Sequence, residues 1–156
     1  MKFKETPDCF YFIAEASNEN SDLAGQVVWQ KALINSKKFF LSNGIVSLEH
    51  RHQRRLSDTQ ILKDARYIIG KPVSVYIDEN SVMVEGKLYK SNKFAKIIIE
   101  LLRRGSNKVK ASVGGFSPGI IKAHGKETVV SLLWNDLALT VRPVNNTLQA
   151  VRGLRA

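Results

Sequence analysis

Residues 110–119, KASVGGFSPG, place a serine beside several glycines. Ser112 stands where a strand would meet these glycines, so a substrate carbonyl could approach its hydroxyl closely. The backbone N–H groups of Gly114 or Gly115 could then point at that carbonyl. A serine acts as a nucleophile when a base lies within hydrogen-bond reach and a third group orients the base. A loop without chemistry is the other interpretation of this segment.

The candidate bases are three histidines. His50 ends the apolar segment 45–50, IVSLEH, where a strand end would fix its direction and leave the ring accessible, so it is the best-placed base. A surface histidine in a charged segment is the alternative. His52 lies in a basic loop and His124 precedes a predicted turn, and both are interpreted as surface residues. His50 and His52 could also bind a metal, but no third ligand is obvious, and neither a metal nor a cofactor is expected.

Asp136 is the candidate orienting group. It lies within residues 129–141, VVSLLWNDLALTV, which are apolar on both faces of a strand and therefore predict burial on both sides. A buried carboxylate is costly unless it is paired or hydrogen-bonded, and a carboxylate that orients a histidine meets this requirement. Alternatively, Asn135 and Asp136 form a bulge or turn between two shorter strands.

The elements that would position these residues predict a single α+β domain over residues 1–156, with a mostly antiparallel sheet or barrel-like core and two main helices. Strands are predicted at 9–16 and 45–50, in a hairpin over 66–91 that turns at 78–81, and in a hairpin over 119–144 that turns near Gly125 and Lys126. Helices are predicted at 27–44 and 91–105, a loop at 17–26, an exposed charged segment at 51–60 and a C-terminal tail at 147–156.

The clearest element is the helix at 91–105. Its apolar face is predicted to consist of Phe94, Ile97, Ile98, Leu101 and Leu102. Ser91 or Asn92 could cap its start, and Gly105 its end. Asn43 and Gly44 predict the end of the other helix in the same way.

Composition sets wider limits. The formal net charge is +10, with an acidic N-terminal segment followed by a strongly basic stretch over residues 25–110, so a polyanionic partner is expected unless the protein is merely basic. Cys9 is the only cysteine, which excludes an internal disulfide and a cysteine-based metal cluster. No apolar run approaches the roughly 20 residues that span a bilayer, and no secretory signal is visible, so an intracellular protein without membrane association is expected.

Five segments in this order resemble the prohead (procapsid maturation) serine proteases of tailed phages, which are distantly related to the herpesvirus assemblins. They are VSLEH at 46–50, the hairpin IIGKPVSVYIDENSVMVEGKLYKS at 68–91, FAKIIIELLRRG at 94–105, KASVGGFSPG at 110–119 and LLWNDLALTVRPVNN at 132–146. Each motif is short, and the resemblance lies in their order and spacing over residues 44–146.

The resemblance implies His50 as general base, Ser112 as nucleophile and Asp136 as orienting carboxylate. His52 is the alternative base, or a third member as in the His–Ser–His arrangement of the herpesvirus relatives. Val113 and Gly114 are the expected backbone donors to the oxyanion. The implied activity is cleavage of scaffold, of the capsid-protein precursor and of the protease itself, inside the immature capsid in the host cytoplasm. A protein of basic net charge is expected to attract acidic scaffold proteins. The resemblance is also compatible with a homo-oligomer.

Two other functions remain open on the sequence. A nucleic-acid-binding module is suggested by the basic clusters RHQRR at 51–55 and LLRRGSNKVK at 101–110, although no aromatic residues are interleaved with them. A structural virion protein without chemistry is the second. Near Ser112 in sequence, four basic side chains could bind an acidic substrate or an oxyanion, or form a solvated helix end: Arg103, Arg104, Lys108 and Lys110.

Overall fold

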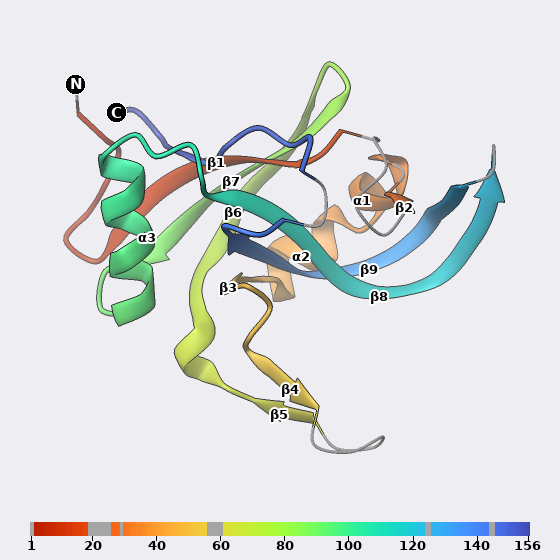
Figure 1. Cartoon of the computed structure of the whole chain (residues 1–156), viewed down its shortest axis with the longest axis horizontal. Helices are drawn as coiled ribbons and strands as arrows, with labels where there is room; N and C mark the ends of the chain where they lie inside the picture. Colours follow the sequence, from red (N-terminus) through yellow and green to blue (C-terminus); the bar gives the residue numbers. More distant parts are fainter. Residues whose placement is uncertain (1, 19–25, 29, 56–60, 124–125, 144–145) are drawn as a thin grey trace.

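A curled mixed sheet of eight strands forms the body of the protein, with helices packed on it (Figure 1). The computed structural model describes residues 2–18, 26–28, 30–55, 61–123, 126–143 and 146–156. The sheet contains β1 (Cys9–Ser17), β2 (Gln26–Val28), β3 (Ile45–Leu48), β6 (Ile68–Asp78), β7 (Ser81–Tyr89), β8 (Lys110–Ala123), β9 (Lys126–Thr140) and β10 (Arg152–Gly153). The helices are α1 (Gln30–Asn35), α2 (Lys37–Asn43) and α3 (Lys93–Arg103), and a 3-10 turn, η1, covers Ala65–Tyr67. The single α+β domain is as predicted from the sequence.

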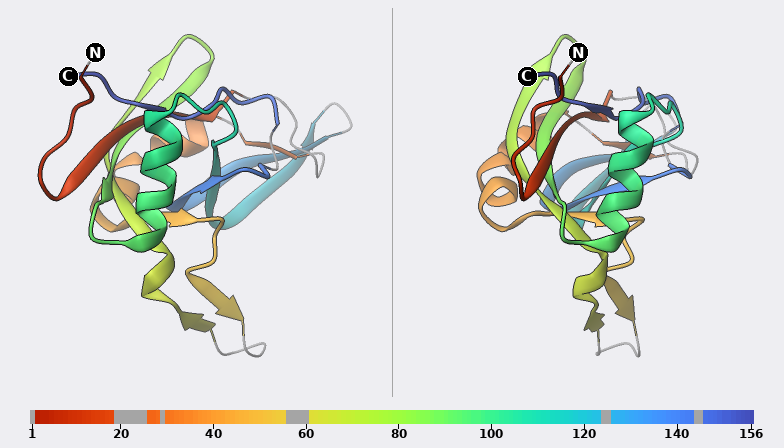
Figure 2. Two further views of the ribbon diagram at one scale, coloured as in Figure 1. Left: turned by 60° about the vertical axis from the view of Figure 1, so that its left-hand side comes forward. Right: turned by 90° about the vertical axis from the view of Figure 1, so that its left-hand side faces the viewer.

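The strand order is β10-β1-β7-β6-β3-β9-β2, and β8 pairs with the other edge of β9. Most neighbours are antiparallel, as expected, but β3 and β2 both run parallel to β9. A separate ribbon of β4 (Gln53–Arg55) and β5 (Ile61–Lys63) projects from the body below β3 (Figure 2). Part of the segment 51–60, which was predicted to be exposed and charged, forms β4 of this ribbon. Its residues 56–60 lie outside the described part of the chain.

The predicted helix at 27–44 is wrong at its start and in its middle. Residues 26–28 form β2, and the remainder divides at Ser36 into α1 and α2. The Ser36 hydroxyl accepts a hydrogen bond from the backbone N–H of Trp134 at 2.9 Å, so the break is fixed by a contact with β9 that local sequence does not reveal. Phe40 stacks on the Trp134 ring with centroids 3.8 Å apart, which fastens α2 to the same strand.

The predicted stop at Gly44 is correct, but for a different physical reason. Its φ is −73°, which any residue can adopt. A Cβ at this position would lie 2.3 Å from the Phe40 ring. Glycine is therefore required for space, and it lets the chain pass directly from α2 into β3.

The helix predicted at 91–105 is α3, capped by Asn92, whose side chain accepts from the N–H groups of Phe94 and Ala95. Gly105 follows its end with a φ of 72°, in the left-handed region that favours glycine. The predicted apolar face is partly wrong, because Ile97 is 58% exposed. The buried side chains are Ala95, Ile98, Ile99 and Leu102, a stripe one position away from the predicted one.

The two predicted hairpins are present, with one change of boundary. β6 and β7 pair from Asp78 and Ser81, so the turn at 78–81 is confirmed. β8 ends at Ala123 and β9 begins at Lys126, while the predicted turn residue Gly125 and the nearby His124 lie outside the described residues. β8 begins at Lys110, so residues 110–119 are strand and not a loop.

The segment expected to be a tail at 147–156 is built into the fold. Leu148 and Val151 are buried, and β10 pairs with β1. Leu154 accepts a backbone hydrogen bond from Lys4, so the two ends of the chain lie side by side (Figure 1). The predicted loop at 17–26 falls mostly on residues outside the described ranges. In the described part of the chain, no helix is long and apolar enough to cross a membrane.

Glu5 ties the N-terminal segment to α3 and should make stability depend on pH. Its carboxylate accepts from both terminal nitrogens of Arg103, at 2.8 and 3.0 Å, and from Lys90 Nζ at 2.7 Å. The Arg103 hydrogen bonds, followed by that of Lys90, lower the Glu5 pKa from 4.5 to about 2. Because the folded-state pKa is depressed, this stabilisation is complete above pH 4.5 and is lost as the pH falls towards 2.

We therefore expect Glu5→Gln to lower the urea midpoint at pH 6, where the wild-type carboxylate is ionised, and to lower it less at pH 3. Urea unfolding followed by tryptophan fluorescence at both pH values measures the difference. Glu79→Gln, at the exposed turn of the β6–β7 hairpin, is the matched control. An unchanged gap between Glu5→Gln and wild type at the two pH values would contradict the assignment.

Candidate active site

Ser112, His50 and Asp136 form a hydrogen-bonded chain. His50 Nε2 lies 3.1 Å from Ser112 Oγ, and His50 Nδ1 lies 2.5 Å from Asp136 Oδ2. A carboxylate can only accept, so Nδ1 carries the proton toward Asp136 and Nε2 of the neutral ring accepts from the serine hydroxyl. The three residues that the sequence singled out are therefore in contact, with His50 between Ser112 and Asp136.

The sheet register explains how Ser112 and Asp136 share a face. Ser112 pairs with Ala138 and Gly114 pairs with Asp136 in the antiparallel β8–β9 ladder. Directly opposed residues point to the same face, and so do residues two apart on a strand. Both side chains therefore rise from the same side of the sheet, one step apart diagonally.

The absence of a side chain at Gly114 leaves room for the His50 ring. A Cβ at Gly114 would lie 3.0 Å from both Cε1 and Nδ1 of His50 and 3.1 Å from the Cβ of Asp136. The imidazole thus occupies the space that a side chain opposite Asp136 would fill. Sequence reasoning assigned Gly114 to the oxyanion and missed this role, because the role depends on strand pairing.

A tight turn carries His50 over that face. The N–H of Arg51 donates to the carbonyl of Leu48 at 2.9 Å, and the two residues between them, Glu49 and His50, have φ values of 52° and 59°. Two successive left-handed residues define a turn of type I′, which folds the chain back sharply. Such conformations cost non-glycine residues of order 1–3 kcal/mol each and are typical of functional sites. The predicted strand at 45–50 therefore ends at Leu48, and His50 belongs to the turn.

The Asp136 carboxylate is buried, whereas the His50 imidazole is accessible to solvent. Asp136 is 2% exposed, whereas the His50 side chain retains 39% exposure and Ser112 is half-buried. The Asp136 carbonyl accepts from the indole N–H of Trp134 at 2.9 Å. The register shifts so that Gly115 faces Trp134 while Gly114 faces Asp136, which makes Asn135 the extra residue of a bulge. The predicted burial of Asp136 is confirmed, and it lies against a histidine. The alternative is right about the bulge but wrong about two shorter strands, because β9 runs unbroken from Lys126 to Thr140.

His52 was interpreted as a surface residue, and that is wrong. It is only 7% exposed, and its Nδ1 lies 3.8 Å from Asp136 Oδ2. As an alternative base it is less well placed than His50, because the Ser112 hydroxyl already donates to His50 Nε2. The sequence contains no signal for this burial, since residues 51–55 are strongly charged around it.

The candidate oxyanion donors lie within β8. Val113 and Gly114 pair with Leu137 and Asp136. Successive N–H groups of a strand point to opposite edges, so only one of these two can point away from β9 toward a substrate. The basic side chains near Ser112 in sequence are partly engaged elsewhere: Arg103 binds Glu5, and Lys110 Nζ donates to the carbonyl of Asn146 at 2.9 Å.

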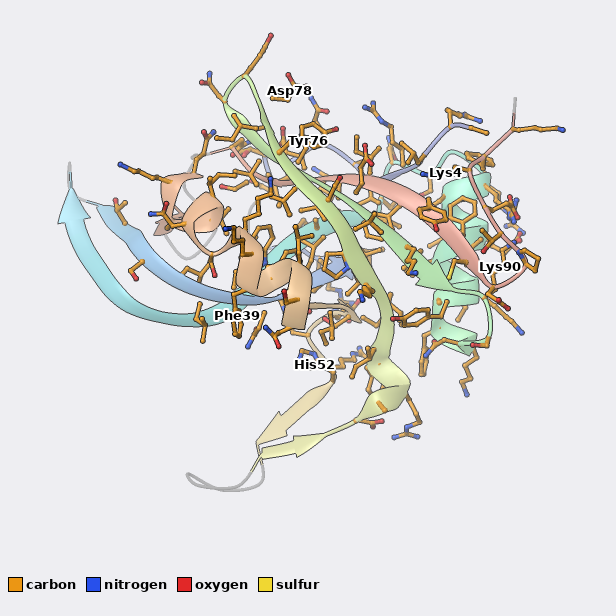
Figure 3. The ribbon with its side chains drawn as sticks, turned by 180° about the vertical axis from the view of Figure 1, so that it is seen from behind. Lys4, Phe39, His52, Tyr76, Asp78 and Lys90 are labelled. Carbon is orange, nitrogen blue, oxygen red and sulfur yellow. The ribbon has the colours of Figure 1, made fainter. Side chains whose placement is uncertain are left out.

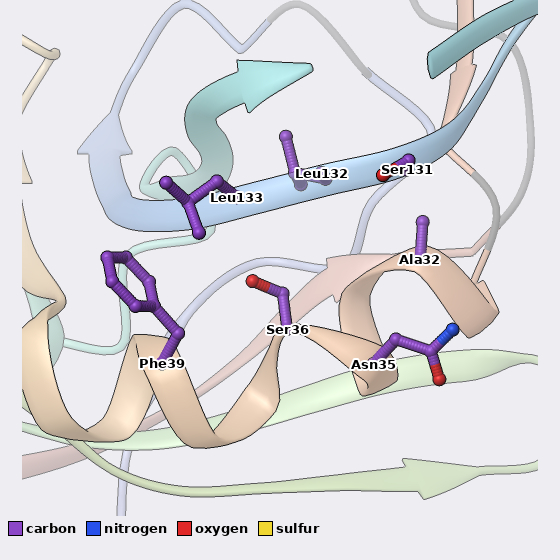
Figure 4. Close-up of a pocket in the computed structure, with 7 residues that line it drawn as sticks. All are labelled: Ala32, Asn35, Ser36, Phe39, Ser131, Leu132 and Leu133. Atoms are coloured by element: carbon purple, nitrogen blue, oxygen red, sulfur yellow. The ribbon is translucent and has the colours of Figure 1, made fainter. Parts of the chain in front are cut away.

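A hollow of about 250 Å³ lies elsewhere on β9, against α1 and α2 (Figure 4). Its lining consists of Ala32, Asn35, Ser36, Phe39, Ser131, Leu132 and Leu133. None of the three hydrogen-bonded site residues lines it. Among the described residues, no group of three or more His, Cys, Asp or Glu side chains is arranged to hold a metal ion.

Comparisons with protein-family models, with curated proteins and with solved structures return no match to this chain. The geometry is that of a Ser–His–Asp arrangement, with Ser112 on β8, Asp136 on β9 and His50 in the turn after β3.

Gly114→Ala is expected to reduce turnover about a hundredfold, because a ring displaced by as little as 1 Å loses its alignment with Ser112. The new methyl group would press on His50 and on Asp136, while the strand itself accepts alanine. Ser42→Ala, exposed on α2 and outside the site, is the control. Hydrolysis rates and thermal melts of both variants separate misalignment of His50 from unfolding. A Gly114→Ala protein with wild-type turnover would contradict the claim that the His50 ring needs the space at Gly114.

Proposed function

We propose that this protein is a serine endopeptidase in which Ser112 is the nucleophile. The carrying observation is the hydrogen-bonded chain from Ser112 Oγ through His50 to Asp136 Oδ2. A half-exposed serine and imidazole beside a buried carboxylate match the accessibility that acyl transfer to a large substrate needs.

The reaction follows from the geometry. Ser112 Oγ attacks the peptide carbonyl carbon as its proton passes to His50 Nε2, and Asp136 stabilises the imidazolium that forms. His50 then gives that proton to the leaving amine nitrogen, the C–N bond breaks and an acyl ester remains on Ser112. Water attacks the ester with His50 as base, releasing the carboxylic acid and restoring the serine hydroxyl.

We further propose that the substrates are phage scaffold and capsid-precursor proteins, and the protease itself. The order of the motifs around His50, Ser112 and Asp136 supports this assignment, as does a net charge of +10 that suits acidic scaffold. Maturation inside a procapsid, in the host cytoplasm, is the corresponding setting. Binding to a scaffold peptide should weaken with salt, because its electrostatic part is screened.

A fluorophosphonate probe tests the nucleophile directly. We expect covalent labelling of the folded protein at Ser112, located by peptide mass spectrometry, and loss of labelling after denaturation. His50→Gln should suppress labelling because no base then accepts the Ser112 proton. A label on another serine, or no reaction at any pH at which the protein is folded, would count against the enzyme and in favour of a binding or structural protein.

A further inference from the structure

A second imidazole lies against the carboxylate oxygen that already binds His50. His52 Nδ1 is 3.8 Å from Asp136 Oδ2, and His50 Nδ1 is 2.5 Å from the same atom. The longer separation exceeds that of a hydrogen bond. It is short enough for a strong electrostatic interaction in a buried site, where the solvent screens little. Asp136 Oδ2 is therefore flanked by two histidines.

The second carboxylate oxygen, Oδ1, does not fix the orientation of the Asp136 side chain. Asp136 Oδ1 is buried and has no hydrogen-bond partner among the described residues. The single described hydrogen bond to the carboxylate, from His50, fixes one oxygen but permits rotation about that contact. His52 Nδ1, 3.8 Å from Oδ2, is the other described side-chain nitrogen close enough to restrict that rotation.

The main chain holds His52 in place from both sides. It directly follows the turn that carries His50, and its carbonyl accepts the N–H of Asp64 at 2.6 Å, where the β4–β5 ribbon returns (Figure 3). The Asp64 carboxylate in turn binds the backbone N–H and the guanidinium of Arg66. The main chain of His52 is thus held where the β4–β5 ribbon leaves the body of the protein.

We infer that His52 is a positioning residue, which keeps the Asp136 carboxylate turned toward His50. Its role in catalysis rests on the proposed function. Beside His52, the described charged and ionisable groups are Asp136, which also binds His50, the Glu49–Arg51 ion pair of the preceding turn and the Asp64–Arg66 pair that follows β5.

Two substitutions test this role. In His52→Asn the amide nitrogen replaces Nδ1, and in His52→Phe a ring of similar size fills the space without a nitrogen. In a Ser112→Ala background, the strongly deshielded Nδ1 proton of His50, followed by NMR, should persist in His52→Asn and be lost in His52→Phe. An unchanged Nδ1 proton in His52→Phe overturns the inference.

Peptide hydrolysis then tests the catalytic part. We expect His52→Phe to lower kcat roughly tenfold with little change in KM, the size of loss seen when a supporting partner is removed. His52→Asn should restore most of this rate at neutral pH. If the purified protein cleaves no peptide but the Nδ1 proton of His50 is lost in His52→Phe, the proposed function fails and the positioning of Asp136 stands. Equal kcat in wild type and His52→Phe would remove the catalytic role of His52.

Discussion

Ser112→Ala is expected to abolish peptide cleavage while the fold remains intact. Without Oγ there is no atom to form the acyl ester, and loss of the nucleophile from such a triad costs on the order of a million-fold in kcat. The substitution deletes one half-buried hydroxyl whose described partner is His50, so the thermal midpoint should change little. The measurement is cleavage of scaffold and of the chain itself by purified protein, followed by gel electrophoresis and mass spectrometry.

Ser42→Ala provides the matched control, because Ser42 is exposed on α2 and outside the site. It should cleave at the wild-type rate. Continued cleavage by purified Ser112→Ala at more than about a thousandth of that rate would be incompatible with Ser112 as the nucleophile, since binding and oxyanion contacts alone leave less activity than this.

Asp136→Asn is expected to lower kcat by about ten-thousandfold without unfolding the protein. An amide of the same shape can present its N–H to His50 Nδ1, which then becomes an acceptor and moves the ring proton to Nε2. Nε2 would then face Ser112 as a donor and could no longer take the serine proton. Removing a buried charge with an isosteric group need not destabilise the fold, so a preserved thermal midpoint is part of the expectation.

Asn135→Ala tests whether any substitution in the β-bulge lowers kcat as much as Asp136→Asn does. Asn135 is next to Asp136 but has no described contact with His50, and its substitution should leave kcat within a fewfold of wild type. If Asp136→Asn retained more than a tenth of wild-type kcat, the 2.5 Å contact with His50 would not be the orienting interaction.

Local sequence was sufficient where one element determines its own geometry. The start of α3 follows from Asn92 and its end from Gly105, and the β6–β7 hairpin follows from two apolar runs around a polar turn. The candidate residues Ser112, His50 and Asp136 could also be selected, because glycines, a strand end and a carboxylate in an apolar run are unusual neighbours.

The sequence did not predict features that depend on partners distant in the chain. Residues 27 and 28 were predicted to begin a helix, yet parallel pairing with β9 makes them part of a strand, β2. Ile97 is exposed because the faces of β6, β7 and β10 select which stripe of α3 is buried. His52 lies among arginines in sequence, whereas in the fold it lies against Asp136, a residue distant in the chain.

The C-terminal strand has a consequence for the synthesis of this protein on the ribosome. Val109, three residues before Ser112, accepts a backbone hydrogen bond from Val151, and Lys110 is held by the carbonyl of Asn146. β1, among the first elements to emerge, remains without its β10 neighbour until residues 152–153 are available. β8, which carries Ser112, therefore gains these two supports only after residues 146–151 have been synthesised. The geometry around Ser112 thus depends on chain that is translated after it, and a fragment ending before residue 146 would lack both contacts.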